Sequence, residues 1–286
     1  MTTAATSHEL TTTGPRLVMV DGIAAYDYGG RGQDIVLLHG LGDDSGGWAN
    51  FAVELLGRGF RPVAMDLRGH GASAAGEWTW STVTQDLSTV INELGLRDPV
   101  VAGHSLGGMV ASVWAAEHPE FPFAVNIDGY PHPSRLVEND LNSSADQHDD
   151  SVAGPLRFLV TALPEMLNAY STVTAQWELL DILGLYATTT RPVLIVLCDL
   201  PDYTGLPPQM VSALTVHRSV SAAELTAIAD TNPNVHIVHV PTGHYPHNEI
   251  PAQLSDIVQS SNPVAHQTRI RSSQVSLVVS GCRRSQ

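Results

Sequence analysis

Ser105 stands at the centre of Gly103-His104-Ser105-Leu106-Gly107, which has the pattern G-x-S-x-G. The apolar run 99–102 precedes this pentapeptide and a helix-compatible stretch, 109–118, follows it. The order predicts a strand, a sharp turn and a helix, with glycines where strand and helix cross closely. A serine hydroxyl is a weak nucleophile at neutral pH unless a turn exposes it beside a base and backbone N–H donors. The pattern therefore predicts a serine nucleophile.

Two loops at predicted strand ends could supply those partners. The buried run 34–38 leads into His39-Gly40-Leu41-Gly42, a loop that can aim a backbone amide at an oxyanion. Far downstream, the run 235–240 leads into Pro241-Thr242-Gly243-His244. This order makes His244 the candidate base.

With these pieces in this order, the sequence resembles the α/β-hydrolase family from about residue 22 to about residue 258. The resemblance is carried by residues 39–42, 66–71, 103–107 and 243–247. It implies Ser105 as nucleophile, His244 as general base, and an oxyanion hole made by the backbone N–H groups of Leu41 and Leu106. It leaves the substrate open.

The carboxylate that orients the base has more than one candidate. The family usually places it after the strand 193–197, where Pro201 fills the expected position, Asp202 lies one residue late and Asp199 lies early. Some family members place it after the strand that follows the helix behind the nucleophile, and here Asp128 directly follows the run 124–127. We favour Asp128, with Asp202 as the alternative and Asp199 behind both.

Other polar residues beside glycines have structural interpretations. His39, His70 and His104 lack the spacing of a known metal motif and match structural positions of the family. His247 lies three residues past the candidate base and is expected to line a pocket or satisfy a backbone group. Asp66 is expected to bond the glycine-rich turn that follows it. We therefore expect no metal site and no cofactor.

The remaining pattern predicts an α/β fold with a mostly parallel, doubly wound sheet. Two antiparallel edge strands, 16–20 and 23–28, are followed by six parallel strands at 35–38, 62–65, 100–102, 124–127, 193–197 and 236–240. One hydrolase domain is expected over 15–261, with a small helical lid inserted at about 131–191. Residues 1–14 are expected to be disordered, and 262–286 to form a flexible tail.

Composition narrows the function classes. The net charge of −15 argues against binding nucleic acid or an anionic membrane surface. All 14 basic residues are arginine, which excludes Schiff-base and serine–lysine chemistry. Two cysteines suggest no disulfide framework, and neither a signal-like start nor an apolar run of about 18 residues occurs. The expected location is cytoplasmic.

The expected function is a serine hydrolase that cleaves an ester, lactone or thioester through an acyl-enzyme. The alternatives are a carbon–carbon bond hydrolase with the same triad, or a ligand-binding or cyclase member of the fold. Four helically spaced side chains of the expected lid form an apolar stripe, which is Trp177, Leu180, Leu183 and Tyr186. Together with Trp48, this lid stripe suggests a small apolar acyl or ring-bearing substrate. Arg135 and Arg157 are expected to be solvated.

Overall fold

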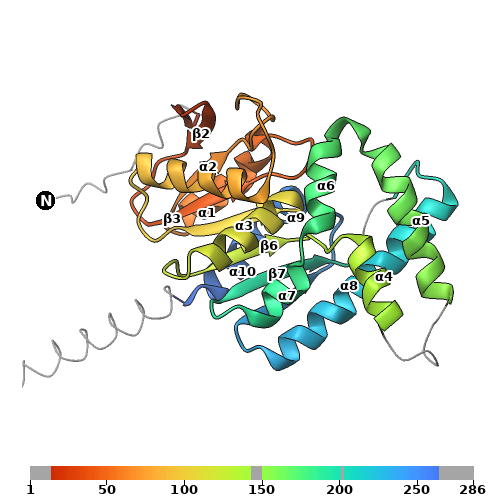
Figure 1. Cartoon of the computed structure of the whole chain (residues 1–286). Helices are drawn as coiled ribbons and strands as arrows, with labels where there is room; N and C mark the ends of the chain where they lie inside the picture. Colours follow the sequence, from red (N-terminus) through yellow and green to blue (C-terminus); the bar gives the residue numbers. More distant parts are fainter. Residues whose placement is uncertain (1–13, 143–149, 201–202, 264–286) are drawn as a thin grey trace, which may run out of the picture.

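An eight-stranded sheet forms the centre of the computed structural model, which describes residues 14–142, 150–200 and 203–263 (Figure 1). The strand order is β1-β2-β4-β3-β5-β6-β7-β8. The first two strands are antiparallel and β3 to β8 run parallel, which confirms the predicted fold class. The strands are β1 (Arg16–Val20), β2 (Ile23–Asp27), β3 (Gln33–Leu38), β4 (Phe60–Met65), β5 (Val100–His104), β6 (Ala124–Ile127), β7 (Val193–Cys198) and β8 (Val235–Val240).

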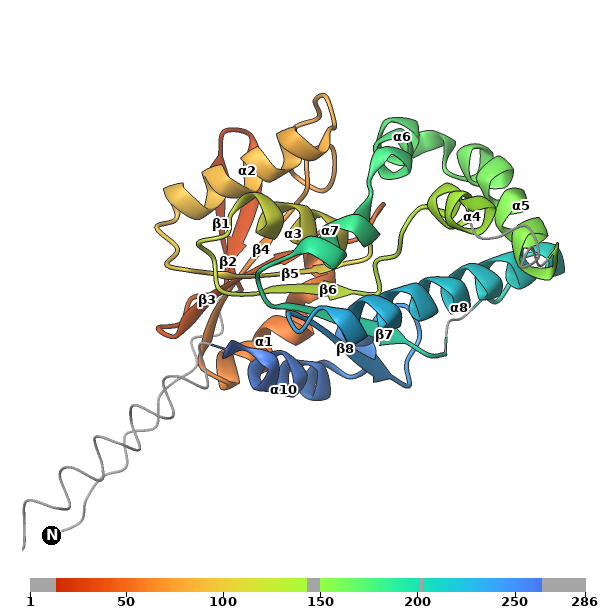
Figure 2. The same ribbon diagram turned by 60° about the horizontal axis from the view of Figure 1, so that its bottom comes forward.

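Helices cover both faces of the sheet (Figure 2). On one face lie α1 (Ala49–Gly57) and α10 (Pro251–Ser261), and the short α9 (Pro246–Glu249) precedes α10. On the other face lie α2 (Trp80–Glu93), α3 (Leu106–Glu117), α7 (Ile182–Thr188) and α8 (Pro208–Thr231). A parallel sheet covered on both faces explains why its strands read as continuous apolar runs rather than alternating ones.

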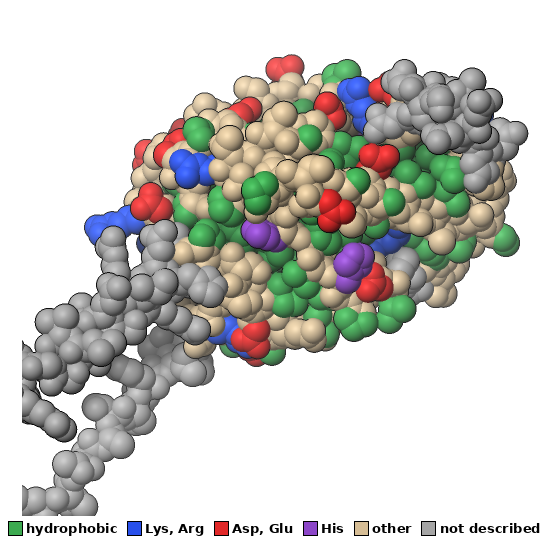
Figure 3. Space-filling model, turned by 90° about the horizontal axis from the view of Figure 1, so that it is seen from below, with side chains coloured by type: hydrophobic (Ala, Val, Ile, Leu, Met, Phe, Trp, Pro, Cys, Tyr) green, Lys and Arg blue, Asp and Glu red, His purple; other side chains and the backbone are tan. Residues whose placement is uncertain are grey.

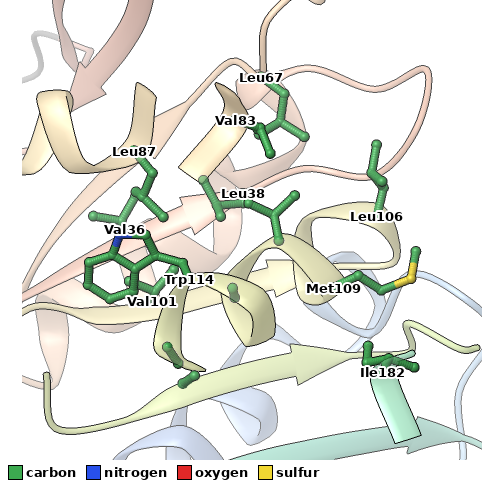
Figure 4. Close-up of a cluster of buried hydrophobic side chains, with 14 of the residues drawn as sticks. Val36, Leu38, Leu67, Val83, Leu87, Val101, Leu106, Met109, Trp114 and Ile182 are labelled. Carbon is green, nitrogen blue, oxygen red and sulfur yellow. The ribbon is translucent and has the colours of Figure 1, made fainter. Parts of the chain in front are cut away.

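The largest of the three hydrophobic clusters among the described residues joins the sheet to α3 (Figure 4). Val36, Leu38 and Val101 of the central strands pack against Trp114 of α3, and all four are buried. Leu106, at the start of α3, is buried in the same cluster. Packed side chains of the central strands and of α3 therefore fix the position of the turn that connects β5 to α3.

A helical region follows β6, where a lid is expected. It comprises α4 (Pro133–Asn142), α5 (Asp150–Met166), the short 3-10 helix η3 (Asn168–Tyr170) and α6 (Ser171–Leu179). Figure 1 shows these helices together at the side of the sheet. The long helix α8 runs from this region along the sheet and packs against α5 (Figure 2). It thereby connects the inserted helices to the main core.

The expected lid stripe is divided between two environments. Helix α6 ends at Leu179 and α7 begins at Ile182, so the helical spacing does not continue through the stripe. Trp177 lines the large cavity described below, but Tyr186 is fully buried in the main core. The hydroxyl of Tyr186 accepts from the amide of Asn126 at 2.6 Å and is 2.8 Å from Ser112 Oγ. The interpretation of Tyr186 as a pocket residue was wrong.

The face drawn in Figure 3 carries scattered acidic and apolar side chains and no continuous basic patch. Among the described residues, no helix is both long and apolar enough to cross a bilayer. The terminal segments 1–13 and 264–286, which include Cys282, lie outside the described residues.

Candidate active site

Ser105 occupies the turn between β5 and α3 in a strained backbone conformation. Its φ is 50° and its ψ is −114°, a combination that non-glycine residues rarely adopt. The backbone N–H of Ser105 donates to the carbonyl of Ile127 at 2.8 Å, which ties the turn to the end of β6. A Cβ at Gly103 or Gly107 would collide with backbone atoms, so the tight crossing requires glycine at both positions. The predicted strand, turn and helix are all present.

Asp128 is the carboxylate that meets His244. It directly follows β6 with a φ of 57°, and its side chain is fully buried. Nδ1–H of His244 donates to Oδ2 of Asp128 at 2.6 Å. This contact leaves Nε2 of the imidazole available for another partner.

Three further groups donate to the Asp128 carboxylate. The Tyr130 hydroxyl lies 2.7 Å from Oδ1, and the backbone N–H of Cys198 lies 2.9 Å from the same oxygen. The guanidinium of Arg218 spans both oxygens, at 2.8 Å from Oδ2 and 3.0 Å from Oδ1. Burial alone would raise the pKa of Asp128, but the hydrogen bonds from His244 and Arg218 hold that pKa well below its usual range. The carboxylate is therefore ionised at neutral pH.

The sequence interpretation did not include Tyr130 or Arg218. Tyr130 is two residues past Asp128, so its proximity could have been noticed. Arg218 lies 90 residues away on α8, where an arginine on a long helix carries no motif. Only the packing of α8 beside the ends of β6 and β7 brings it to the carboxylate.

The other two candidate acids do not provide a described contact with His244. Asp199 accepts from Nδ1 of His239 at 2.8 Å, and both side chains are half exposed. Asp202 lies outside the described residues. Within the described chain, the geometry favours the aspartate after β6.

A cavity of about 400 Å³ opens beside these residues. Ser105, His244 and Asp128 all line it, together with Leu41 and Leu106. Neither Leu41 nor Leu106 uses its backbone N–H in a bond to another described residue. The rest of the wall is largely apolar, and its apolar side chains include Met109, Leu159, Leu163, Met166, Leu167, Val173, Trp177 and Leu214.

Arg135 and Arg157 are not part of this wall. Arg135 donates to Glu138 and to the carbonyl of Leu179, and Arg157 is exposed. Trp48 is also absent from the wall, since it is buried against Phe51 and His247. The polar side chains that do line the cavity include Thr174, Tyr203 and His217.

The neighbouring histidines support the loops. Nε2–H of His104 donates to the backbone carbonyl of His244 at 2.7 Å. Nε2 of His39 accepts from the backbone N–H of Leu67 at 2.9 Å, and Nδ1 of His70 lies 3.1 Å from the carbonyl of Arg68.

Burial lowers the pKa of His247 and of His39 to about 4, so both rings are neutral at pH 7.

The acidic residue after β4 also has a structural contact. Asp66 accepts from the backbone N–H groups of Ser45 and Ala72, which confirms the expected bond to the glycine-rich turn. The described residues contain no cluster of three or more histidine, cysteine or acidic side chains arranged to hold a metal ion.

The sequence of this chain matches one protein family over most of its length. The model of the alpha/beta hydrolase family matches residues 35–257. The chain belongs to the α/β-hydrolase family. That match includes the strand-end loops, the turn at Ser105, the helices between β6 and β7 and the loop at His244.

Individual relatives match shorter parts of the chain. Epoxide hydrolase 4 of Mus musculus is 32% identical over 122 residues, which are 41% of this chain and 34% of that protein. Pimeloyl-[acyl-carrier protein] methyl ester esterase of Chromobacterium violaceum is 40% identical over 94 residues, 32% of this chain and 34% of that one. The chain therefore spans about a third of the length of these hydrolase relatives.

Solved structures of the family match more of the chain at lower identity. E-2-(acetamidomethylene)succinate hydrolase covers 86% of this chain and 97% of its own, with a TM-score of 0.59 and 22% identity. The enol-lactonase from Burkholderia xenovorans covers 86% and 99%, with a TM-score of 0.57 and 18% identity. At these identities the likeness establishes the hydrolase fold alone.

Proposed function

We propose that this protein is a serine hydrolase that cleaves a carboxylic ester, lactone or thioester, with Ser105, His244 and Asp128 as its catalytic triad. The observation that carries the proposal is the 2.6 Å contact between His244 Nδ1 and Asp128 Oδ2 beside a strained Ser105 on one cavity wall. In a triad the carboxylate fixes the tautomer of the imidazole, so that the other nitrogen can accept the serine proton.

The first half of the reaction forms an acyl-enzyme. Oγ of Ser105 attacks the carbonyl carbon while its proton moves to Nε2 of His244, and the carbonyl π electrons move onto oxygen. The backbone N–H groups of Leu41 and Leu106 are the proposed donors to that oxyanion, because both residues line the cavity and neither N–H donates to another described residue. When the carbonyl reforms, the bond to the leaving oxygen or sulfur breaks and His244 returns the proton to it.

The second half releases the acid. His244 takes a proton from water as the water oxygen attacks the acyl carbon, and the same donors bind the second oxyanion. The acyl–Oγ bond then breaks, and His244 protonates Ser105. For a lactone, the alcohol released in the first half stays attached to the acyl group.

The cavity favours an apolar acyl or ring-bearing small molecule as the substrate. Its side walls are formed by aliphatic and aromatic side chains such as Leu163, Val173 and Trp177. The cationic group on the wall, Arg218, is already paired with Asp128. An uncharged acyl chain would bury its surface there without leaving a charge unpaired.

The similar proteins fall into two groups by the bond that their names say they cleave. The methyl ester esterase and the enol-lactonase are named for acyl substrates. The epoxide hydrolase relatives are expected to use a carboxylate at the position of the nucleophile, where this chain has Ser105. Acyl transfer to serine is therefore preferred to epoxide opening.

Labelling with a fluorophosphonate probe, followed by intact-mass measurement, tests the proposal. The wild type should gain one adduct, Ser105→Ala should gain none, and Asp128→Asn should react much more slowly. Asp199→Asn, which changes an exposed aspartate paired with His239, is the matched control and should react at the wild-type rate. No adduct on the wild type would reject the acyl-enzyme mechanism.

A further inference from the structure

Arg218 has an unusual position for a side chain outside the proposed triad. Its side chain is only 15% exposed, and it makes a two-point ion pair with the fully buried Asp128. One of its nitrogens contacts the same carboxylate oxygen that accepts from His244. Two cationic or potentially cationic groups therefore share one oxygen.

The guanidinium is itself held from two other directions. It donates to the backbone carbonyl of Cys198 at the end of β7, and it lies over the ring of Tyr130 at 4.7 Å from the ring centre. A planar guanidinium with fixed partners sets the plane of a carboxylate that it contacts at two points. The other donors to Asp128, Tyr130 and Cys198, both contact Oδ1, so Arg218 adds the second point of support at Oδ2.

The charge of Arg218 has a separate effect on the imidazole. A lone buried carboxylate stabilises an adjacent imidazolium, whereas a second cation on that carboxylate opposes its formation. Other charged or titratable groups also lie around Asp128 and His244. Those near the carboxylate are His217 on α8, Tyr130, Cys198 and Tyr203. Those near the imidazole are His104, His247, Asp43 and Tyr245. Unlike these groups, Arg218 directly contacts Oδ2 of Asp128, the oxygen that His244 uses.

We propose that Arg218 is a positioning residue of the reaction, which holds the Asp128 carboxylate in the plane that meets His244 and adds a fixed positive charge beside that pair. The inference rests on the proposed triad. It has two separable parts, because the geometry requires a fork of two donors and the electrostatic effect requires only a positive charge.

The test is the pH dependence of kcat/KM for an activated ester, with Arg218→Met, Arg218→Gln and Arg218→Lys. The neutral variants should move the acidic limb upward by about one pH unit or more, because a cation next to the pair is lost. Arg218→Lys should keep the limb near its wild-type position and lower kcat by roughly ten- to a hundredfold, because it retains the charge without the fork.

Arg135→Met is the matched control. Arg135 also donates to a carboxylate and a backbone carbonyl, but it is outside the cavity wall. Its limb and kcat should stay at the wild-type values. Thermal unfolding of each variant, measured at every pH of the profile, separates a positioning effect from a loss of folded protein, because the rates are then compared only where the variant is folded.

The outcomes distinguish this inference from the proposed function. A wild type that fluorophosphonate fails to label rejects the triad itself. A labelled wild type with an unmoved limb in the folded neutral variants rejects the electrostatic role. If neither neutral variant folds, Arg218→Lys decides both parts, because an unchanged kcat rejects the clamp and a limb shifted as far as one unit rejects the charge effect.

Discussion

The backbone N–H of Cys198 donates to Oδ1 of Asp128 across 2.9 Å. This bond ties the carboxyl end of β7 to the aspartate at the end of β6, and the backbone N–H of Asp128 in turn donates to Val196 of β7 at 2.8 Å. Adjacent parallel strands end at the same edge of the sheet. An acid placed after β6 can therefore reach the same histidine as one placed after β7, and here the end of β7 supplies a hydrogen-bond donor to it.

This arrangement predicts that Asp128→Asn lowers kcat/KM by roughly 10³- to 10⁴-fold, because an amide that donates to Nδ1 stabilises the wrong tautomer of His244. Steady-state kinetics on an activated ester measure the effect. Asp199→Asn should stay within about twofold of the wild type. Equal losses in the two variants would contradict the assignment of the acid to Asp128.

The cavity wall predicts a preference for longer acyl chains. Each methylene that enters the cavity should raise kcat/KM by a few-fold, since burying one contributes about 0.8 kcal/mol. Leu163→Trp places a larger side chain on the wall and should remove this gain for long chains while leaving short esters nearly unchanged. A series of p-nitrophenyl esters from acetate to dodecanoate measures it.

The control for this series is Leu179→Trp, because Leu179 is 67% exposed and lies outside the cavity wall. Its chain-length profile should follow that of the wild type. A profile that Leu163→Trp does not alter would place the acyl group elsewhere.

The tight turn at Ser105 predicts that alanine substitutions at two glycines differ widely in their effect on stability. A Cβ at Gly107 would overlap the carbonyl oxygens of Leu38 and His39, which cannot move without shifting β3. Gly107→Ala should therefore lower the free energy of unfolding by about 3 kcal/mol or more. Gly57, at the end of α1, has open space around its Cβ position, so Gly57→Ala should be neutral or stabilise by up to about 1 kcal/mol. Urea unfolding measures both, and equal losses would reject the close crossing.

The fold could be predicted from the sequence because its signals are local. Apolar runs such as 35–38 and 193–197 are bounded by turn residues, and parallel strands covered on both faces give this pattern. Ser105 and His244 stand beside glycines at strand ends, where short motifs mark them. Their catalytic roles remain predictions, but their places in the chain followed from these motifs.

Other parts of the site depend on contacts between distant segments. Asp128 and His244 are 116 residues apart. The sequence favoured Asp128 because Pro201 fills the position expected for the acid after the strand 193–197, but the contact itself depends on which strand ends lie side by side. Arg218 reaches the carboxylate from the middle of a long helix, which no local pattern indicates. The prediction that Tyr186 lines the pocket was wrong for a related reason. The helix breaks after Leu179, and Tyr186 therefore contacts Asn126 in the core.

Buried histidines predict that the protein loses stability in mild acid. Burial lowers the pKa of His247 and His217 to about 4, whereas an unfolded chain binds the proton at about 6.5. The neutral rings therefore favour the folded state above pH 6.5, and this contribution is lost as the pH falls from about 6.5 to 4. A shift of this size corresponds to at most about 3 kcal/mol for each ring.

His247→Phe tests this linkage, because the His247 ring packs 4.3 Å from the Trp48 ring and a phenyl group of similar shape cannot take a proton. Its free energy of unfolding should fall less steeply than that of the wild type between pH 6.5 and 4, as measured by urea unfolding at each pH. His236→Phe changes an exposed histidine on β8 and should leave the wild-type slope. Parallel pH profiles for the wild type and His247→Phe would show that the buried ring does not contribute to acid sensitivity.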